Sequence, residues 1–442
     1  MERVILHSDM NNCYASIELL YNPQWRGVPL IVGGDPQARH GIVLAKDQLA
    51  KKAGVKTGMA LWEAKQACPG ARIVRPHMDL YLKFSRLAHE IYASYTDQVE
   101  PFGIDESWLD VTASRACRGD GETIAQEIRE RMKEELGVTV SVGVSWNKIF
   151  AKLGSDYKKP DAVTVITREN WKDVVWPLPA GDLLYVGPAT RRALEQRRIF
   201  TIGELAQADP ELLQLVFGKM GLVLHVFANG LDQTPVEADG WEAPVKSIGN
   251  SVTTPRDMVT RQDISVMICA LADTVSARLR LHGFWARRVT LWLRDSGLHG
   301  STKQCRLPKP TDISGEIGAA AMRLVDEAWD GRMPLRSIGV RAGDLITAGS
   351  PVQRDLFTDE EAREKRRILD RTVDEIRVRF GAGSIRRCLQ DLDPTLRDIH
   401  SREEHLVHPR GYFENGNRTG AGEEEQHGTD GDETVRVRHR GA

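Results

Sequence analysis

Two features that the sequence lacks, long apolar runs and paired cysteines, narrow the class of protein. No apolar run approaches the roughly 20 residues that a helix needs to cross a bilayer, so a membrane association is not expected. The six cysteines are scattered without a Cys-x-x-Cys pair, which argues against a disulfide framework and a zinc site. The opening "MERVILHSDM" does not resemble a signal peptide. We therefore expect a protein of a reducing compartment, with the cytoplasm as the default.

Net charge is also nearly absent, since the formal charge at pH 7 is −2. This balance gives no global sign of a nucleic-acid partner. The charges are nevertheless distributed unevenly. Residues 244–349 hold 15 Lys and Arg against 10 Asp and Glu, whereas the tail from Asp398 holds 10 acids against 6 Lys and Arg. A basic module in a chain with an acidic tail is compatible with a polyanionic ligand, but does not by itself predict one.

Length and segment pattern predict several globular domains. At 442 residues, the chain is too long for one compact core. Strand-like and helix-like segments mix without regular βαβ spacing up to about residue 166, which favours an α+β layer over a doubly wound sheet. Short helical segments follow over 167–232, a linker with Pro and acids over 233–245, and then further strands with a helix near 315–329. The chain from Ser401 is rich in Gly, Glu and His and is expected to be disordered.

Asp105 and Glu106 stand side by side in "VEPFGIDESWLDV", an otherwise strand-like stretch, although strands disfavour acids and like charges repel. A turn at this step or a bound cation would resolve the conflict. Asp9 closes the opening strand, so neighbouring strand ends would bring three carboxylates to one sheet edge. Such an oxygen cage suits Mg²⁺, and two ions about 3.5–4 Å apart can activate a hydroxyl and stabilise a departing phosphate oxygen. The alternative is three unrelated surface acids beside a turn.

Two segments near these acids suggest phosphate contacts. "MNNCY" opens a helix directly after Asp9, and N–H groups at a helix start favour phosphate oxygens. An Asn cap followed by a core Tyr14 is the alternative. In "SVGVSWNKIFAKLGSDYKKP", Lys148 and Lys152 lie four residues apart on one helical face. Lysines that project toward one cavity suit a triphosphate, whereas a solvated helix face is the usual meaning of this spacing.

A third segment, "LLYVGPATRRALEQRRIFTIGELAQA", suggests a grip on DNA phosphates. It reads as a helix, a Gly187–Pro188 turn and a second, arginine-rich helix, whose first amides would bind the backbone without reading bases. Arginines would add salt-sensitive affinity. A plain helical hairpin is the alternative. The arginines are Arg191, Arg192, Arg197 and Arg198.

Taken in order, "HSDMNNCYASIE", "GIDESWLDVT" and "SVGVSWNKIFAKLGSDYKKP" resemble the motifs of the Y-family, or translesion, DNA polymerases, and within them the DNA polymerase IV branch. The resemblance runs from Val4 to about Arg386. It implies an α+β right-hand polymerase with palm, small fingers, helical thumb and an α/β little-finger domain. The implied parts are a palm (1–10 and 77–166), fingers (11–76), a thumb with a helix–hairpin–helix (167–232), a linker (233–245), a little finger (246–349), a clamp-binding peptide and helix (350–400) and a disordered tail (401–442).

The resemblance also implies roles for matching residues. Asp9 and Asp105 would bind two Mg²⁺ ions, with the Met10 carbonyl as an added ligand. Glu106 would hold the ion that lowers the pKa of the primer 3′-hydroxyl. Tyr14 would be the steric gate that excludes a ribose 2′-OH, and Lys159 would reach the triphosphate. The other implied nucleotide contacts are Asn12, Cys13, Gln48 and Lys51, and the implied DNA contacts are Gly187, Ala189, Thr190, Arg191, Arg287 and Arg288.

Several positions depart from the family pattern. Ala45, Gln48 and Lys51 stand where a Thr and then Tyr-x-x-Arg usually contact the triphosphate. A lysine replaces the charge of an arginine but not its bidentate fork, so nucleotide affinity is expected to differ. The other departures are Asn11, where many members carry a second early acid, and Tyr185 and Arg198, where glycine is common.

"SPVQRDLF", residues 350–357, resembles the clamp-binding peptide of bacterial polymerases. Gln353 would hydrogen-bond at the mouth of a pocket on the sliding clamp, and Leu356 and Phe357 would fill an apolar cleft. This segment follows the last expected strand of the little finger, where a tether belongs. A sliding clamp is therefore an expected partner.

These motifs predict a template-directed, low-fidelity DNA polymerase that extends a primer by two-metal nucleotidyl transfer in translesion synthesis and DNA repair. Its expected partners are primer-template DNA, deoxynucleoside triphosphates and the clamp, and a monomer is expected. One alternative is a catalytically weak or inactive clamp-bound accessory protein, which the substituted Ala45, Gln48 and Lys51 would explain. A nucleotide cyclase built on a similar palm is another, but it leaves the thumb-like hairpin and the clamp-like peptide without a purpose.

Overall fold

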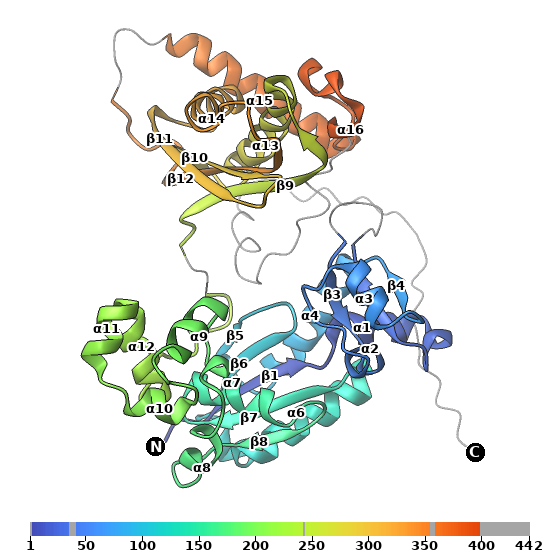
Figure 1. The fold of residues 1–442 in the computed structure, drawn as a ribbon, viewed down its shortest axis with the longest axis vertical. Coiled ribbons are helices and arrows are strands. Elements are labelled where there is room, and N and C mark those ends of the chain that lie inside the picture. Colours follow the sequence, from blue (N-terminus) through green and yellow to red (C-terminus); the bar gives the residue numbers. More distant parts are fainter. Residues whose placement is uncertain (1, 35–40, 242–243, 354–358, 398–442) are drawn as a thin grey trace.

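The computed structural model describes residues 2–34, 41–241, 244–353 and 359–397. Mixed sheets and helices make up both halves of the chain, so the predicted α+β class is confirmed (Figure 1). The sheet of the C-terminal half forms a separate lobe, which an extended connection joins to the rest. Within the described residues, no helix combines the length and apolar character that crossing a bilayer requires.

A five-stranded sheet of order β5-β6-β1-β7-β8 lies in the first 166 residues. The central strand β1 pairs antiparallel with both β6 and β7. The strands are β1 (Ile5–Met10), β5 (Val99–Pro101), β6 (Glu106–Asp110), β7 (Val140–Ser145) and β8 (Val163–Val165). The predicted turn in the acidic stretch thus spans residues 102–105, and Glu106 already belongs to β6.

Helices cover both faces of this sheet, which explains why every residue of β1 except the partly exposed Asp9 is buried. The helices are α4 (Met78–Ala93), α6 (Gly121–Leu136) and α7 (Lys148–Tyr157). Successive strand residues point to opposite faces, so Leu6 packs among the residues of α4 and α6, whereas Ile5 packs with Ala151 of α7. By the same alternation, Asp9 belongs to the face of α7. The small helix α5 (Arg115–Arg118) precedes α6.

Close packing of α7 depends on glycine in β7. A Cβ atom at Gly143 would lie only 1.9 Å from the Ala151 carbonyl oxygen and 2.5 Å from the Ser155 nitrogen. Because no side chain intervenes, α7 sits directly on the strand. The side chain of Asn147 caps the helix by accepting from the Phe150 N–H at 2.8 Å. Together, the glycine and the cap fix the position of the lysines that α7 carries.

A smaller sheet of order β3-β2-β4 and helix α1 lie between residues 13 and 74. Helix α1 ends before Pro23, as predicted, and Asn12 precedes its first residue in the left-handed conformation (φ 50°). The elements are α1 (Cys13–Tyr21), the 3₁₀ turn η1 (Pro23–Trp25), β2 (Leu30–Gly33), β3 (Val43–Lys46), α2 (Gln48–Lys52), α3 (Leu61–Ala67) and β4 (Arg72–Val74).

Short helices follow: α8 (Trp171–Val175), α9 (Pro188–Glu195), α10 (Ile202–Gln207), α11 (Pro210–Phe217) and α12 (Lys219–Ala228). The helix predicted before Gly187 is wrong, because only the three-residue 3₁₀ turn η2 (Ala180–Asp182) forms there. Tyr185 and Arg198, at positions where glycine is common in the family, take φ values of 70° and 61°. These left-handed conformations are costly for residues with a Cβ atom.

The C-terminal lobe contains an antiparallel sheet of order β11-β10-β12-β9. The alternating residues Val289, Leu291 and Leu293 are buried beneath helices. Figure 1 shows these helices, α13 (Arg261–Leu281) and α14 (Ser314–Ala328), on one face of the sheet. The elements are β9 (Ser247–Met258), α13 (Arg261–Leu281), β10 (Phe284–Asp295), β11 (Gly300–Thr311), α14 (Ser314–Ala328) and β12 (Leu335–Thr347).

Helix α15 (Glu360–Phe380) packs back onto this lobe, followed by the 3₁₀ turn η3 (Cys388–Leu392) and α16 (Pro394–Arg397). Arg280 of α13 is 7% exposed and donates to Asp374 at 2.7 Å, with Asp370 also within 3.5 Å. Arg363 and Arg367 of α15 pair with Glu316 and Asp312. The sequence left open whether this helix packs or stays exposed; ion pairs hold it in place.

Candidate active site

Strand pairing brings the three predicted acids to one edge of the five-stranded sheet. Asp9 of β1 lies directly opposite Glu106 of β6. The Met10 N–H donates to the Asp105 carbonyl at 2.9 Å, which ties the end of the hairpin turn to the end of β1. Residues that are about 96 positions apart in sequence therefore become neighbours. The three acids, which come from two distant parts of the sequence, therefore lie close together in the structure.

Two lysines and a histidine hold two of these acids. Lys159 Nζ lies 2.7 Å from Asp9 Oδ2, and Lys152 donates to Glu106 Oε2. His7 Nε2 lies 3.3 Å from the same Glu106 oxygen. Burial works to raise the pKa of Glu106, but the hydrogen bond from His7 and the charge of Lys152 outweigh it and lower this pKa to about 2. Glu106 is thus ionised at neutral pH.

For Asp105, the nearby charge of Lys159 does not outweigh the effects that raise its pKa. Burial raises its pKa to about 6, and the negative charges of Asp9 and Glu106 contribute in the same direction. Burial also raises the pKa of Asp9, against the opposing charge of Lys159. The cluster therefore carries more negative charge than its surroundings neutralise, which is the condition under which a cation binds.

The chemistry of the donors fits a hard cation. Carboxylate and carbonyl oxygens are the ligands that Mg²⁺ prefers, and Met10, Asp105 and Glu106 line one small pocket. No three Asp, Glu, His or Cys side chains are gathered as a ready-made metal site in the part of the chain that the structure describes. The ammonium groups of Lys159 and Lys152 contact oxygens of Asp9 and Glu106. They act as monovalent stand-ins for a cation at this cluster.

Lys148 and Lys152 do not project together into a cavity, nor do they form a solvated face. Lys148 is buried, donates to both carboxylate oxygens of Glu100 at 2.6 and 2.7 Å, and lies 4.4 Å from the centre of the Trp108 ring. Its charge supports the hairpin that presents the acids. Both interpretations of the lysine pattern were therefore wrong for Lys148, because Glu100 and Trp108 come from a distant part of the sequence.

Tyr14 lies on α1 close to the acids. Its ring stacks on that of Tyr81 of α4, with centroids 4.2 Å apart and planes 8° from parallel. Burial and the nearby charge of Asp105 raise the pKa of Tyr14 to about 12, so its hydroxyl stays protonated. Tyr81 in turn donates to Glu18 at 2.5 Å, and His77 Nδ1 contacts the same carboxylate oxygen at 2.8 Å. Tyr14 is thus held from behind by a fixed aromatic ring.

The residues between Asp9 and Tyr14 have structural partners. Cys13 is buried in the core. The Asn12 carbonyl accepts from the Ser16 N–H at 2.9 Å. The side chain of Asn11 donates to Ser141 and accepts from the Asp161 N–H at 2.8 Å. Since Asp161 follows Lys159 by two residues, Asn11 ties the loop of Lys159 to the acid strand.

The positions that depart from the family pattern lie on β3 and α2. Ala45 packs against the core cluster that includes Tyr14. Gln48 is the first residue of α2, which Asp47 caps by accepting from the Ala50 N–H, and Lys51 is exposed. Gln48 and Lys51 thus stand on a capped helix beside a strand that packs near Tyr14.

The predicted DNA-contacting residues occupy two surfaces. Gly187 caps α9 at its start, and Ala189 and Thr190 lie in the first turn of that helix. Arg191 pairs with Glu195 at 2.7 Å on an exposed surface, where such a pair is weak. On β10, Arg287 is exposed, whereas Arg288 pairs with Asp344 at 2.6 Å. Of these two β10 arginines, Arg288 is therefore already partly neutralised.

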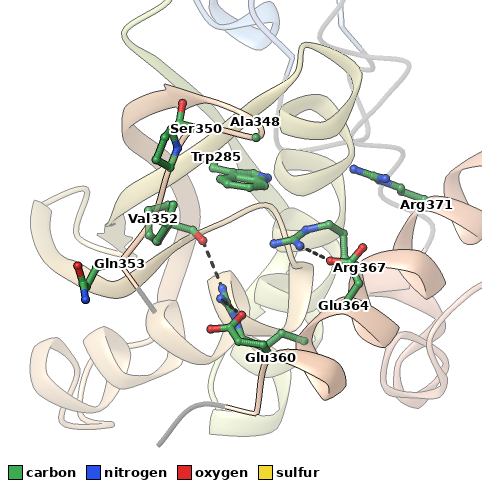
Figure 2. A pocket seen from close by; sticks show the side chains of 13 residues that line it. Trp285, Ala348, Ser350, Val352, Gln353, Glu360, Glu364, Arg367 and Arg371 are labelled. Carbon is green, nitrogen blue, oxygen red and sulfur yellow. Dashed lines mark hydrogen bonds and ion pairs between the residues drawn. The ribbon is translucent and has the colours of Figure 1, made fainter. Parts of the chain in front are cut away.

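Gln353 lies at the rim of a cavity of about 810 Å³ between α15 and the end of β12 (Figure 2). Trp285 forms one wall, with the Arg367 guanidinium 5.0 Å from the centre of its ring. Leu356 and Phe357, the other two residues of the predicted clamp-binding peptide, lie outside the described residues.

Sequence reasoning missed three residues that support the site. His7 contacts Glu106, Tyr81 stacks on Tyr14, and Glu100 of the hairpin pairs with Lys148. His7 carried one signal, because a titratable residue inside an apolar strand two positions before Asp9 shares its face of the sheet. The others gave none, since their partners lie 46 or more residues away.

Comparisons with known proteins identify chains that are similar to this one. Models of the impB/mucB/samB family and of its C-terminal domain match residues 8–156 and 245–356. A DNA polymerase IV of Acetivibrio thermocellus is 50% identical over 393 residues, covering 88% of this chain and 98% of the relative. A DNA polymerase IV of Moorella thermoacetica is 39% identical, covering 87% and 95%.

Solved structures give the same result. The "Y-family DNA polymerase chimera Dbh-Dpo4(243-245)-Dbh" superposes with a TM-score of 0.69 at 25% identity, covering 78% of this chain and 99% of that one. The "Insertion ternary complex of Dbh DNA polymerase" superposes with a TM-score of 0.54 at 25% identity and the same coverage. The chain belongs to the impB/mucB/samB family of Y-family DNA polymerases, beside relatives named DNA polymerase IV.

Proposed function

We propose that this protein is a DNA-directed DNA polymerase whose nucleotidyl transfer takes place at Asp9, Asp105 and Glu106. It adds deoxynucleotides to a primer 3′-hydroxyl with low fidelity, in translesion synthesis and repair. Membership of the family supports the polymerase activity. The pairing of Asp9 with Glu106 across β1 and β6 is the observation that supports this location of the site.

The carboxylates of Asp9 and Asp105 and the Met10 carbonyl would hold two Mg²⁺ ions, with Glu106 beside the primer end. When bound, such ions activate the hydroxyl and stabilise the departing phosphate oxygen. An ion that took Asp9 Oδ2 would displace Lys159 from this oxygen. The freed ammonium group then lies beside the incoming triphosphate, where its point charge supports phosphate binding.

Tyr14 would select the sugar. Its ring is fixed by the stack on Tyr81, so it cannot yield easily to a ribose 2′-hydroxyl. The raised pKa of the Tyr14 hydroxyl keeps a negative charge away from the triphosphate. Asn12, Cys13, Gln48 and Lys51 complete the proposed nucleotide surface.

The elements suggest an assignment to the parts of a right hand. The palm would be 1–10 and 77–166, the fingers 11–76, the thumb 167–232 and the little finger 246–349, with a linker at 233–245. The small β3-β2-β4 sheet leaves little protein to check a base pair, which supports low fidelity. The start of α9 and the exposed Arg287 would contact DNA phosphates.

The catalytically weak accessory protein is not favoured. Its motivation was the substitution of Ala45, Gln48 and Lys51. An inactive scaffold gains nothing from burying Asp105 beside two other acids, since burial, with the charges of Asp9 and Glu106, raises its pKa to about 6. A retained electrostatic cost of this kind is typical of a working site.

A sliding clamp is the proposed further partner, supported by "SPVQRDLF" between β12 and α15. A monomer and a cytoplasmic location are also proposed, since the substrates are primer-template DNA and deoxynucleotides. Primer extension with and without purified clamp, comparing Phe357→Ala with the exposed control Pro351→Ala, tests the partner. Loss of clamp stimulation in Phe357→Ala alone would support it.

Primer extension with Mg²⁺ on undamaged and lesion-bearing templates tests the function itself. Asp105→Asn and Glu106→Gln should each lower kcat at least a hundredfold, an effect comparable to losing a major transition-state contact. Glu90→Gln, an exposed acid on α4, is the matched control and should keep full activity. Inactive wild-type protein, or unchanged rates in both acid variants, would contradict the proposal.

A further inference from the structure

We infer that His7 is a positioning residue that fixes the Glu106 carboxylate for catalysis, acting as the middle member of a Ser155–His7–Glu106 chain. The inference rests on the proposed function, because it gives Glu106 its role. His7 would contact neither nucleotide nor primer. Its effect would pass entirely through the orientation of one carboxylate oxygen.

The contacts of His7 are unusual for a core residue. The side chain is fully buried in β1, yet both ring nitrogens face polar groups. Nδ1 lies 2.8 Å from Ser155 Oγ of α7, and Nε2 lies 3.3 Å from Glu106 Oε2 of β6. The ring also packs against Trp108, with centroids 5.3 Å apart. Three elements thus determine the ring's position.

The chemistry of the partners decides which nitrogen carries the proton. A carboxylate only accepts, so a proton on Nε2 makes the 3.3 Å contact with Glu106 Oε2 attractive, although its geometry does not complete a hydrogen bond. In the neutral ring Nδ1 is then an acceptor for the Ser155 hydroxyl. Ser155 Oγ also lies 2.8 Å from the Lys152 carbonyl, which competes for the same proton.

Both fixed partners of Glu106 reach the same oxygen. His7 and Lys152 meet at Oε2, and neither contact uses Oε1. A glutamate has several rotatable bonds, and a lysine is a flexible point charge that cannot alone fix a carboxylate plane. The rigid imidazole supplies the missing constraint. Oε1 is thereby left for a cation, beside Gly103, which Asp105 Oδ1 also faces.

A simpler alternative is that His7 only fills space beside Trp108. The two roles can be separated by substitution at His7. The amide nitrogen of a glutamine at this position reaches the place of Nε2, whereas that of an asparagine reaches the place of Nδ1. His7→Gln keeps the contact with Glu106 and loses Ser155. His7→Asn keeps Ser155 and loses Glu106. A packing role predicts similar losses in both variants.

The experiment compares steady-state primer extension by the full chain and these variants. His7→Asn should lower kcat by about tenfold or more with little change in KM for the deoxynucleotide, as loss of a supporting contact does. His7→Gln should stay within about threefold of wild type. Ser155→Ala, which removes the other end of the chain but keeps the ring, should give a smaller kcat loss. Equal kcat losses in the two His7 variants, or a change confined to KM, would overturn the inference.

Calorimetric titration with Mn²⁺ supplies a readout that does not need turnover. His7→Asn should bind Mn²⁺ about tenfold more weakly than His7→Gln, and melting temperatures of the two should agree. If wild-type protein extends no primer, the proposed function fails while this titration still decides the role of His7. Equal Mn²⁺ affinities in the two variants would overturn it.

Discussion

The ring of Tyr14 lies flat on the ring of Tyr81, with 4.2 Å between centroids. One tyrosine comes from α1 after the acid strand and the other from the first turn of α4, so the stack joins the small sheet region to the five-stranded sheet. A side chain that must reject one hydroxyl group needs such backing, because a mobile ring would move aside. The stack explains how a single residue could discriminate between sugars.

Removing the ring should open this gate. Tyr14→Ala is expected to raise ribonucleotide incorporation by on the order of tenfold to a hundredfold while deoxynucleotide use changes little, since the discrimination is steric. Tyr21→Ala, on the exposed end of the same helix, is the control. Single-nucleotide insertion assays with each sugar measure the ratio. An unchanged ratio in Tyr14→Ala would refute the assignment.

The Asp9–Lys159 ion pair should compete with cations for one carboxylate. Lys159→Met is expected to bind Mn²⁺ several-fold more tightly without nucleotide, because Asp9 Oδ2 is freed. The same variant should raise KM for deoxynucleotides, since the triphosphate loses a positive charge. Calorimetry and steady-state kinetics measure the two effects. Lys158→Met is the control, and weaker Mn²⁺ binding by Lys159→Met would contradict the competition.

Acid should weaken the C-terminal lobe through Asp263. This residue caps α13 and pairs with Arg256 at 2.6 Å. Burial works to raise its pKa, but the hydrogen bond from Arg256 and three more around the cap lower it to about 2. Because the folded pKa lies below the unfolded value of about 3.9, the contribution is complete above pH 4 and is lost as pH falls toward 2. After allowance for solvent screening it amounts to about 1–2 kcal/mol.

Asp263→Asn should therefore lower the melting temperature at pH 6, and the difference from wild type should shrink toward pH 2. Differential scanning calorimetry across this range measures it. Asp326→Asn removes an exposed pair with Arg261 and should have little effect at any pH. A pH-independent difference for Asp263→Asn would show that the charge is not responsible.

Arg198 offers a test of backbone strain in the short-helix region. Its φ of 61° costs a residue with a Cβ atom roughly 1 kcal/mol, so Arg198→Gly should stabilise the protein slightly or leave it unchanged. Arg197→Gly removes the same charge one residue earlier, where φ is not positive, and should destabilise by about 1 kcal/mol. Thermal unfolding of both variants gives the comparison. A larger loss for Arg198→Gly than for Arg197→Gly would contradict it.

Periodicity predicted the elements that are held by local signals. Asn12 and Pro23 bound α1, Gly137 ends α6, and the alternation around Leu291 marks β10. The helix predicted before Gly187 was wrong, because a loop and one 3₁₀ turn replace it. Apolar residues there fill the core around Leu183 without helical geometry.

The acids were visible in the sequence because charge inside a strand conflicts with burial. Their supporting residues were not. Lys148 looked like an ordinary surface lysine, and only the folded hairpin provides Glu100 to neutralise it. His7 looked like one polar residue in an apolar strand, and its partners come from α7 and β6. Long-range pairing creates these roles, so a linear pattern cannot reveal them.

The docking of α15 has a mechanical consequence for the peptide before it. Thr347 ends β12 and Glu360 begins α15, and both are anchored in the same lobe. The intervening stretch is therefore tethered at its two ends, and about 12 residues of chain reach only about 20 Å outward and back. A ring-shaped partner gripping this stretch would be held at short range from the β11-β10-β12-β9 sheet. Tension on that grip would be transmitted to the lobe rather than absorbed by a free tail.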